Sequence, residues 1–207
     1  MLEQGHQPQC LCGLDRLSPV IAFSLLLACG AEQPATPPPS RVDAVMAVPT
    51  KKPIDPAEFC ENDLKVAPQT FAWPDLDGPA PEIAGGWTWV NVWATWCAPC
   101  VEEMPRLQAW EPKLQAAAGA GSLQFLSVDQ TAEVVTRFLE HHPDLRAGPR
   151  IRDFSQLEGW LPTIGLDAGA VLPIHVFLDA QQRIRCVREG AVSKQDYEVV
   201  VKVLSDL

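Results

Sequence analysis

Long apolar runs alternate with amphipathic stretches over the C-terminal two thirds of the chain. Residues 86–94 (GWTWVNVWA) are almost wholly apolar, and residues 122–129 (SLQFLSVD) form a second run of this kind. Such runs predict central strands covered on both faces. Between them, residues 99–118 carry Leu107, Trp110 and Leu114 at helical spacing, with Pro105 expected to kink the helix. We therefore predict a β-α-β unit with parallel strands.

The remaining pattern predicts a second helix, a hairpin and a closing helix. Residues 131–143 place Val134, Val135, Phe138 and Leu139 on one helical face. Residues 173–179 and 183–190 read as two strands joined by a short turn. Further helices are predicted over residues 153–162 and 193–207, and shorter elements over residues 55–62 and 69–78 with a turn at residues 77–78. The predicted class is α/β, with a central mixed β-sheet flanked by helices.

The N-terminal part has a different pattern. Residues 19–28 (PVIAFSLLLA) are apolar but well short of the ~20 residues that span a bilayer, which is typical of a signal peptide. The following LLACG resembles a bacterial lipobox, which makes Cys29 the expected lipid carrier and residues 1–28 a lipoprotein-type signal peptide. The alternative is a buried N-terminal strand or helix in which Cys29 is an ordinary core cysteine.

Residues 29–67 are rich in proline and small residues and show no strand or helix period over most of their length. Such a segment buries too little apolar surface to fold, so we interpret it as the lipidated cysteine and a tether with a short extension before a domain at residues 68–207. This arrangement places a lipid-anchored domain in the bacterial cell envelope, facing the periplasm. The formal net charge of −10 argues against nucleic acid as a partner.

The clearest chemical motif is the pair Cys97 and Cys100 directly after the first predicted strand. A zinc site needs about four ligands, whereas this chain has a single Cys-x-x-Cys, and His141 and His142 lie on another predicted helix. A purely structural disulfide is the second alternative, but it would close a very small loop and constrain the unfolded chain little. Neither a metal nor an organic cofactor is expected.

A reactive dithiol has a physical mechanism at this position. Cys97 falls where a strand ends and a helix begins, and the unpaired N–H groups and dipole there favour a thiolate. Cys100 lies one turn further in, placed to resolve a mixed disulfide on Cys97. Pro99 fixes the backbone between them and lacks an N–H where none is needed.

With these residues the chain resembles the thioredoxin-fold thiol–disulfide oxidoreductases, in particular the exported, membrane-anchored TlpA-like branch. The resemblance covers residues 68–207 through FAWPDLDG, VNVWATWCAPC, FLSVD and LPIHVFLD. It implies a thioredoxin-like three-layer sandwich. It also implies that Pro173 is cis and, with Trp96 and Pro99, forms the surface on which a substrate chain docks.

Two positions near the motif distinguish the branch. Asn91 stands where cytosolic thioredoxins have a buried Asp, and it cannot accept a proton. Glu103, one turn after Cys100, matches an acidic residue of reductive TlpA-like proteins and would disfavour a thiolate and shuttle its proton. The alternative is a solvated helix-face glutamate like its neighbour Glu102.

Two cysteines of the mature chain remain once Cys29 is lipidated and the dithiol is paired. In an oxidising compartment an even remainder suggests a Cys60–Cys186 disulfide, and two buried free thiols are the alternative.

The sequence thus predicts an envelope enzyme that reduces or exchanges disulfides in exported proteins, with a role in cytochrome c maturation implied by the resemblance. Its expected partners are disulfide-bearing exported proteins, a DsbD-like membrane thiol donor and the membrane through its lipid anchor, and a monomer is expected. The alternatives are a thiol peroxidase of the peroxiredoxin group, against which Ala94 stands where that group has Thr, and a non-catalytic thioredoxin-fold binding domain.

Overall fold

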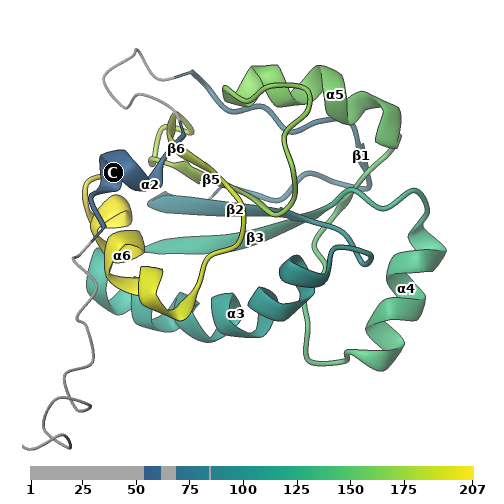
Figure 1. Cartoon of the computed structure of the whole chain (residues 1–207), viewed down its shortest axis with the longest axis horizontal. Helices are drawn as coiled ribbons and strands as arrows, with labels where there is room; N and C mark the ends of the chain where they lie inside the picture. The colour runs from purple at the N-terminus through teal and green to yellow at the C-terminus, as the bar shows by residue number, and fades with distance from the viewer. Residues whose placement is uncertain (1–53, 62–68, 84) are drawn as a thin grey trace, which may run out of the picture. The chain divides into compact units, whose positions relative to one another are not determined.

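The strands form one mixed six-stranded sheet in a computed structural model that describes residues 54–61, 69–83 and 85–207 (Figure 1). Its order is β1-β4-β3-β2-β5-β6. β2 pairs in parallel with β3 and antiparallel with β5, and β5 pairs antiparallel with β6. The strands are β1 (Leu76–Asp77), β2 (Trp87–Trp93), β3 (Gly121–Ser127), β4 (Arg150–Ile151), β5 (Ile174–Leu178) and β6 (Ile184–Glu189).

β2 is a central strand, since it pairs with β3 on one edge and with β5 on the other, and both of its faces are covered. All seven of its side chains are buried. The helix α3 (Ala98–Ala118) connects β2 to the parallel strand β3, so the predicted β-α-β unit is confirmed. Pro105 and Pro112 both lie within α3, and the helix continues through them.

The helices lie on the two sides of this sheet. α3 packs against α6 (Tyr197–Ser205) on one side, and α5 (Leu157–Trp160) lies on the other (Figure 1). The predicted three-layer arrangement of a central mixed sheet flanked by helices is therefore confirmed. The other helical elements are α2 (Pro56–Phe59), α4 (Ala132–His141) and the 3₁₀ turns Phe154–Gln156, Leu161–Ile164 and Lys194–Asp196.

Some local predictions differ from the structure. The segment expected to turn at residues 77–78 instead forms β1 up to Asp77, which pairs antiparallel with β4. β4 was not predicted, because a two-residue strand is too short to show a period. Val134 was predicted on the apolar face of α4, yet it is 39% exposed and only Val135 of that helix is buried. This helix covers little of the core, so part of its apolar stripe stays at the surface.

The segment before the main sheet joins the same core. The predicted helical turn is present as α2, capped by the Asp55 side chain, which accepts from the Ala57 N–H at 3.0 Å. Phe59 is buried and its ring lies 6.1 Å from that of Phe177. Cys60 follows directly and forms a disulfide with Cys186 of β6.

The predicted signal peptide, Cys29, most of the Pro-rich tether and the expected domain boundary at residue 68 lie outside the described residues. Within the described ranges, no helix is long and apolar enough to cross a membrane.

Candidate active site

The two motif cysteines form a disulfide at the start of α3. Cys97 is the N-cap residue of this helix, and its Sγ lies 3.3 Å from the backbone N–H of Cys100, which donates to it. Cys97 is 6% exposed, whereas Cys100 is completely buried. An incoming sulfur therefore reaches Cys97 first, and Cys100 lies behind it within the fold.

The loop between β2 and Cys97 is held in place by a buried aspartate. Thr95 donates to the Asp129 carboxylate from its backbone N–H at 3.0 Å and from its hydroxyl at 2.7 Å. The Ser127 hydroxyl donates to the same carboxylate at 2.9 Å. Asp129 was not singled out from the sequence, although its place at the end of a predicted buried strand was a usable signal. It fixes the backbone immediately before the nucleophile position.

Three buried polar side chains, Asn91, Glu103 and His175, contact one another beneath the start of α3. We call them the buried polar cluster. The Asn91 amide donates to Glu103 Oε1 at 2.9 Å, and its nitrogen lies 3.3 Å from His175 Nδ1. Glu103 Oε2 accepts from the Val192 N–H at 2.7 Å, and His175 Nε2 lies 3.4 Å from Glu103 Oε1. The strand register creates this contact, because Asn91 of β2 is paired with His175 of β5.

Glu103 is fully buried, so the alternative of a solvated helix-face glutamate is wrong, whereas Glu102 beside it is exposed. Burial raises the pKa of Glu103 to about 7, although hydrogen bonds from Val192 and Asn91 and the positive charges of Arg106 and Arg188 act to lower it. A carboxyl group with a pKa near neutrality can both accept and return a proton under physiological conditions.

His175 was missed by the sequence interpretation, in which it was one polar residue within an apolar strand. The pKa of His175 is lowered to about 3, mainly by burial. The positive charge of Arg188 lowers it further. The imidazole is therefore neutral near pH 7. The Trp89 indole N–H donates to its Nδ1 at 3.2 Å, so the ring proton of the neutral form lies on Nε2.

The Leu172–Pro173 peptide bond is cis, the geometry that the resemblance implies for this proline. Ile174, the next residue, pairs with Val92 near the end of β2. Pro173 therefore lies at the same end of the sheet as the loop that carries Cys97. Two large apolar side chains close to these residues in the sequence are exposed to solvent. Trp96, directly before Cys97, is 62% exposed, and Val171, two residues before Pro173, is 60% exposed.

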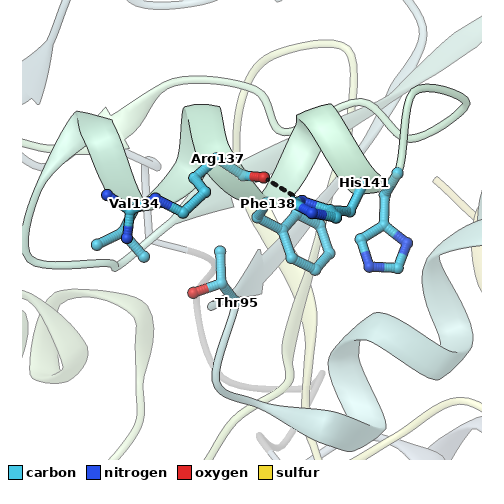
Figure 2. A pocket seen from close by; sticks show the side chains of 6 residues that line it. Thr95, Val134, Arg137, Phe138 and His141 are labelled. Atoms are coloured by element: carbon cyan, nitrogen blue, oxygen red, sulfur yellow. Dashed lines mark hydrogen bonds between the residues drawn. The ribbon is translucent and has the colours of Figure 1, made fainter.

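Two hollows border the cysteine motif. One, of about 350 Å³, is lined by Thr95 and by side chains of α4 and its C-terminal end, including Phe138, His141 and His142 (Figure 2). The other, of about 450 Å³, is lined by Pro99, Arg106 and residues 191–195. His141 uses its Nδ1 to donate to the Arg137 carbonyl at 2.9 Å. Across the described ranges, no three His, Cys, Asp or Glu side chains gather in a way that could hold a metal ion.

Solved structures of redox proteins resemble this chain. A secreted thiol-disulfide isomerase from Corynebacterium glutamicum is 27% identical, with 60% of this chain and 73% of that chain covered at a TM-score of 0.47. A thioredoxin-related protein from Neisseria meningitidis serogroup B is 26% identical, with 62% and 93% covered at a TM-score of 0.48. StoA from Bacillus subtilis is 19% identical, with 66% and 97% covered at a TM-score of 0.42.

No family model matches the chain. The functional conclusion rests on the geometry of the site itself.

Replacing Glu103 with glutamine is expected to change stability, relative to wild type, in a direction that becomes more favourable to the variant as the pH rises. The folded-state pKa of about 7 exceeds the ordinary value of 4.5. The folded protein therefore keeps a proton that the unfolded chain releases, and wild-type stability falls as pH rises through this window. The stability difference between Glu103→Gln and wild type should grow from pH 4.5 to about 7 and then level off, reaching about 3 kcal/mol.

Urea unfolding at several pH values measures this difference. Subtracting the wild-type curve also removes the opposite contribution of His175, whose lowered pKa makes stability fall as the pH drops from about 6.5 to about 3. The matched control is Glu102→Gln, which removes an exposed carboxylate one residue away and should give a flat difference. A flat difference for Glu103→Gln as well would show that Glu103 titrates normally.

Proposed function

We propose that this protein is a thiol–disulfide oxidoreductase that uses Cys97 and Cys100 to reduce or exchange disulfides in partner proteins. The observation that carries the proposal is the Cys97–Cys100 disulfide at the N-terminus of α3, with the outer sulfur on the N-cap residue and, on the next turn, the buried Glu103, whose pKa is raised to about 7 by burial. A helix N-terminus stabilises the thiolate that such chemistry needs.

In the reducing direction the reaction consists of two thiol–disulfide exchange steps. The Cys97 thiolate attacks one sulfur of a client disulfide, forms a mixed disulfide and releases the other client sulfur as a thiolate. Cys100 loses its proton and attacks Cys97 Sγ, which forms the Cys97–Cys100 bond and releases the second client sulfur. Two electrons pass to the client, which takes up two protons, and the disulfide of this protein is then reduced by an external dithiol.

We assign the proton of Cys100 to the carboxylate of Glu103. Cys100 is fully buried and has no access to bulk solvent, so a buried base one helical turn away is the available acceptor. Asn91 cannot take this role but holds Glu103 Oε1 through its amide. The raised pKa of Glu103 keeps the group close to the midpoint of its titration at neutral pH.

The client chain is proposed to dock across Trp96, Pro99 and Pro173. The exposed Trp96 and Val171 give this end of the sheet apolar contact area, and the hollow beside Pro99 gives room for side chains.

The cellular setting is part of the proposal. Lipidation at Cys29, a periplasmic position, a DsbD-like membrane donor, a monomeric state and a role in cytochrome c maturation follow from the sequence resemblance. The Cys60–Cys186 disulfide supports an oxidising compartment, because such bonds seldom persist in a reducing cytosol. Intact mass of the membrane-extracted protein tests the anchor, and a species that still carries Met1 would contradict it.

Equilibration with glutathione tests whether Cys97–Cys100 is a redox couple. We expect the fraction of reduced Cys97 and Cys100 to follow the glutathione potential, while Cys60–Cys186 stays oxidised, as read by alkylation and peptide mass. A Cys97–Cys100 bond that is as inert as Cys60–Cys186 would contradict the proposal. A potential near that of a strong oxidant such as DsbA, about −120 mV, would contradict the reducing direction alone.

A further inference from the structure

We infer that His175 is a positioning residue for the dithiol chemistry, which presents an Nε2–H to Glu103 and thereby sets the pH at which this carboxyl exchanges its proton. The inference rests on the proposed role of Glu103. His175 contacts both other members of the buried polar cluster, Asn91 and Glu103.

Nδ1 of the His175 imidazole accepts hydrogen bonds and carries no proton. Two donors converge on His175 Nδ1, the Trp89 indole at 3.2 Å and the Asn91 amide nitrogen at 3.3 Å. A nitrogen that accepts these hydrogen bonds cannot itself carry a proton. The ring is fully buried with Arg188 on the paired position of the next strand, so a charged imidazolium is also disfavoured.

This tautomer directs the ring proton of His175 toward Glu103. With Nδ1 unprotonated in a neutral ring, the proton lies on Nε2, and Nε2 faces Glu103 Oε1 at 3.4 Å. This is longer than an ordinary hydrogen bond, and within the described residues Nε2 makes no hydrogen bond of ordinary geometry. A backbone hydrogen bond with Gly190 also acts on the ring, and it raises the pKa of His175 against the larger effect of burial. A donor aimed at a carboxyl oxygen favours the ionised form, so His175 counters the effect of burial on Glu103.

The charged and hydrogen-bonding groups that act on Glu103 come from several elements. Asn91 lies on β2, His175 on β5, Arg188 on β6 and Arg106 on α3 itself. The Val192 N–H completes the set from the loop after β6. His175 is the only one of these side chains that combines a neutral ring with a single proton directed at Glu103, so its removal can be separated from a loss of charge.

Two variants at position 175 separate the roles of the two ring nitrogens. Asparagine carries its amide at the place of Nδ1, so His175→Asn can still accept from Trp89 but does not reach Glu103. Glutamine carries its amide near the place of Nε2, so His175→Gln can still donate to Glu103. The midpoint of the Glu103 titration is expected to rise by roughly half a pH unit or more in His175→Asn and to stay close to wild type in His175→Gln.

Carbon-13 NMR of the Glu103 carboxyl in the oxidised full-length protein measures this midpoint without any enzymatic reaction. Equal midpoints in all three proteins, or equal shifts in both variants, would overturn the inference. After reduction, the pH profile of thiol alkylation at Cys97 should move with the Glu103 midpoint, which a purely structural role for His175 would not produce.

Nitrogen-15 NMR of the wild-type imidazole keeps the inference testable if either variant fails to fold. A neutral ring protonated on Nε2 is expected at pH 7, and a proton on Nδ1 or a charged ring would overturn it. These measurements are independent of catalysis. Failure of disulfide exchange therefore counts against the proposed function, and failure of the NMR result counts against His175 alone.

Discussion

Replacing Cys97 with serine is expected to reduce the rate of insulin disulfide reduction to that of the uncatalysed reaction. A hydroxyl is not ionised at neutral pH and does not attack a disulfide, and the loss of an essential nucleophile typically costs roughly 10³-fold or more. Cys97, at the N-cap of α3, is the more accessible of the two cysteines at 6% exposure, whereas Cys100 is completely buried behind it. The assay follows insulin turbidity with a dithiol as the electron source.

The matched variant Cys100→Ser should fail in a different way. Cys97 can still attack, but nothing resolves the mixed disulfide, so this variant should accumulate a one-to-one adduct with the client that non-reducing mass spectrometry detects. The same adduct from Cys97→Ser, and none from Cys100→Ser, would show that the roles are reversed. Full activity of Cys97→Ser would contradict the dithiol mechanism and would favour a non-catalytic binding domain.

The parts of the fold that the sequence predicted are those with a local signal. The run at residues 86–94 contains no charge over nine positions, and a strand with both faces buried needs that composition. The helix start at Cys97 follows from the strand before it and from Pro99. Even so, α4 shows the limit of such patterns, because Val134 has the right spacing and is nevertheless exposed.

The contacts of the buried polar cluster could not be predicted, because they join residues of different strands and of α3 that lie far apart in the sequence. Asn91 and His175 are brought opposite each other by the β2–β5 register, and a shift of one residue would direct His175 to the other face. Glu103 and Glu102 differ in burial only through the rotation of α3 against the sheet. The sequence could offer two alternatives for Glu103, and tertiary packing decides between them.

Replacing Cys60 and Cys186 together with alanine is expected to lower the free energy of unfolding more than any other substitution proposed for this protein. Their disulfide joins residues separated by 126 positions, from Cys60 directly after α2 to Cys186 in β6. In the loop-entropy account a cross-link over this length stabilises the folded state by about 4 to 5 kcal/mol, mainly by restricting the unfolded chain. This is a large part of the roughly 5–15 kcal/mol that separates folded from unfolded domains.

The double variant is the right comparison, because a reductant strong enough to open Cys60–Cys186 would also open Cys97–Cys100. Urea unfolding of both proteins, each with Cys97–Cys100 oxidised, measures the change.

Loss of the cross-link should also raise the m-value, since the unfolded chain then expands and exposes more surface. A loss of core packing alone would lower the midpoint at an unchanged m-value. An unchanged midpoint would show that the bond between α2 and β6 contributes little, and that packing of Phe59 against Phe177 holds this segment without it.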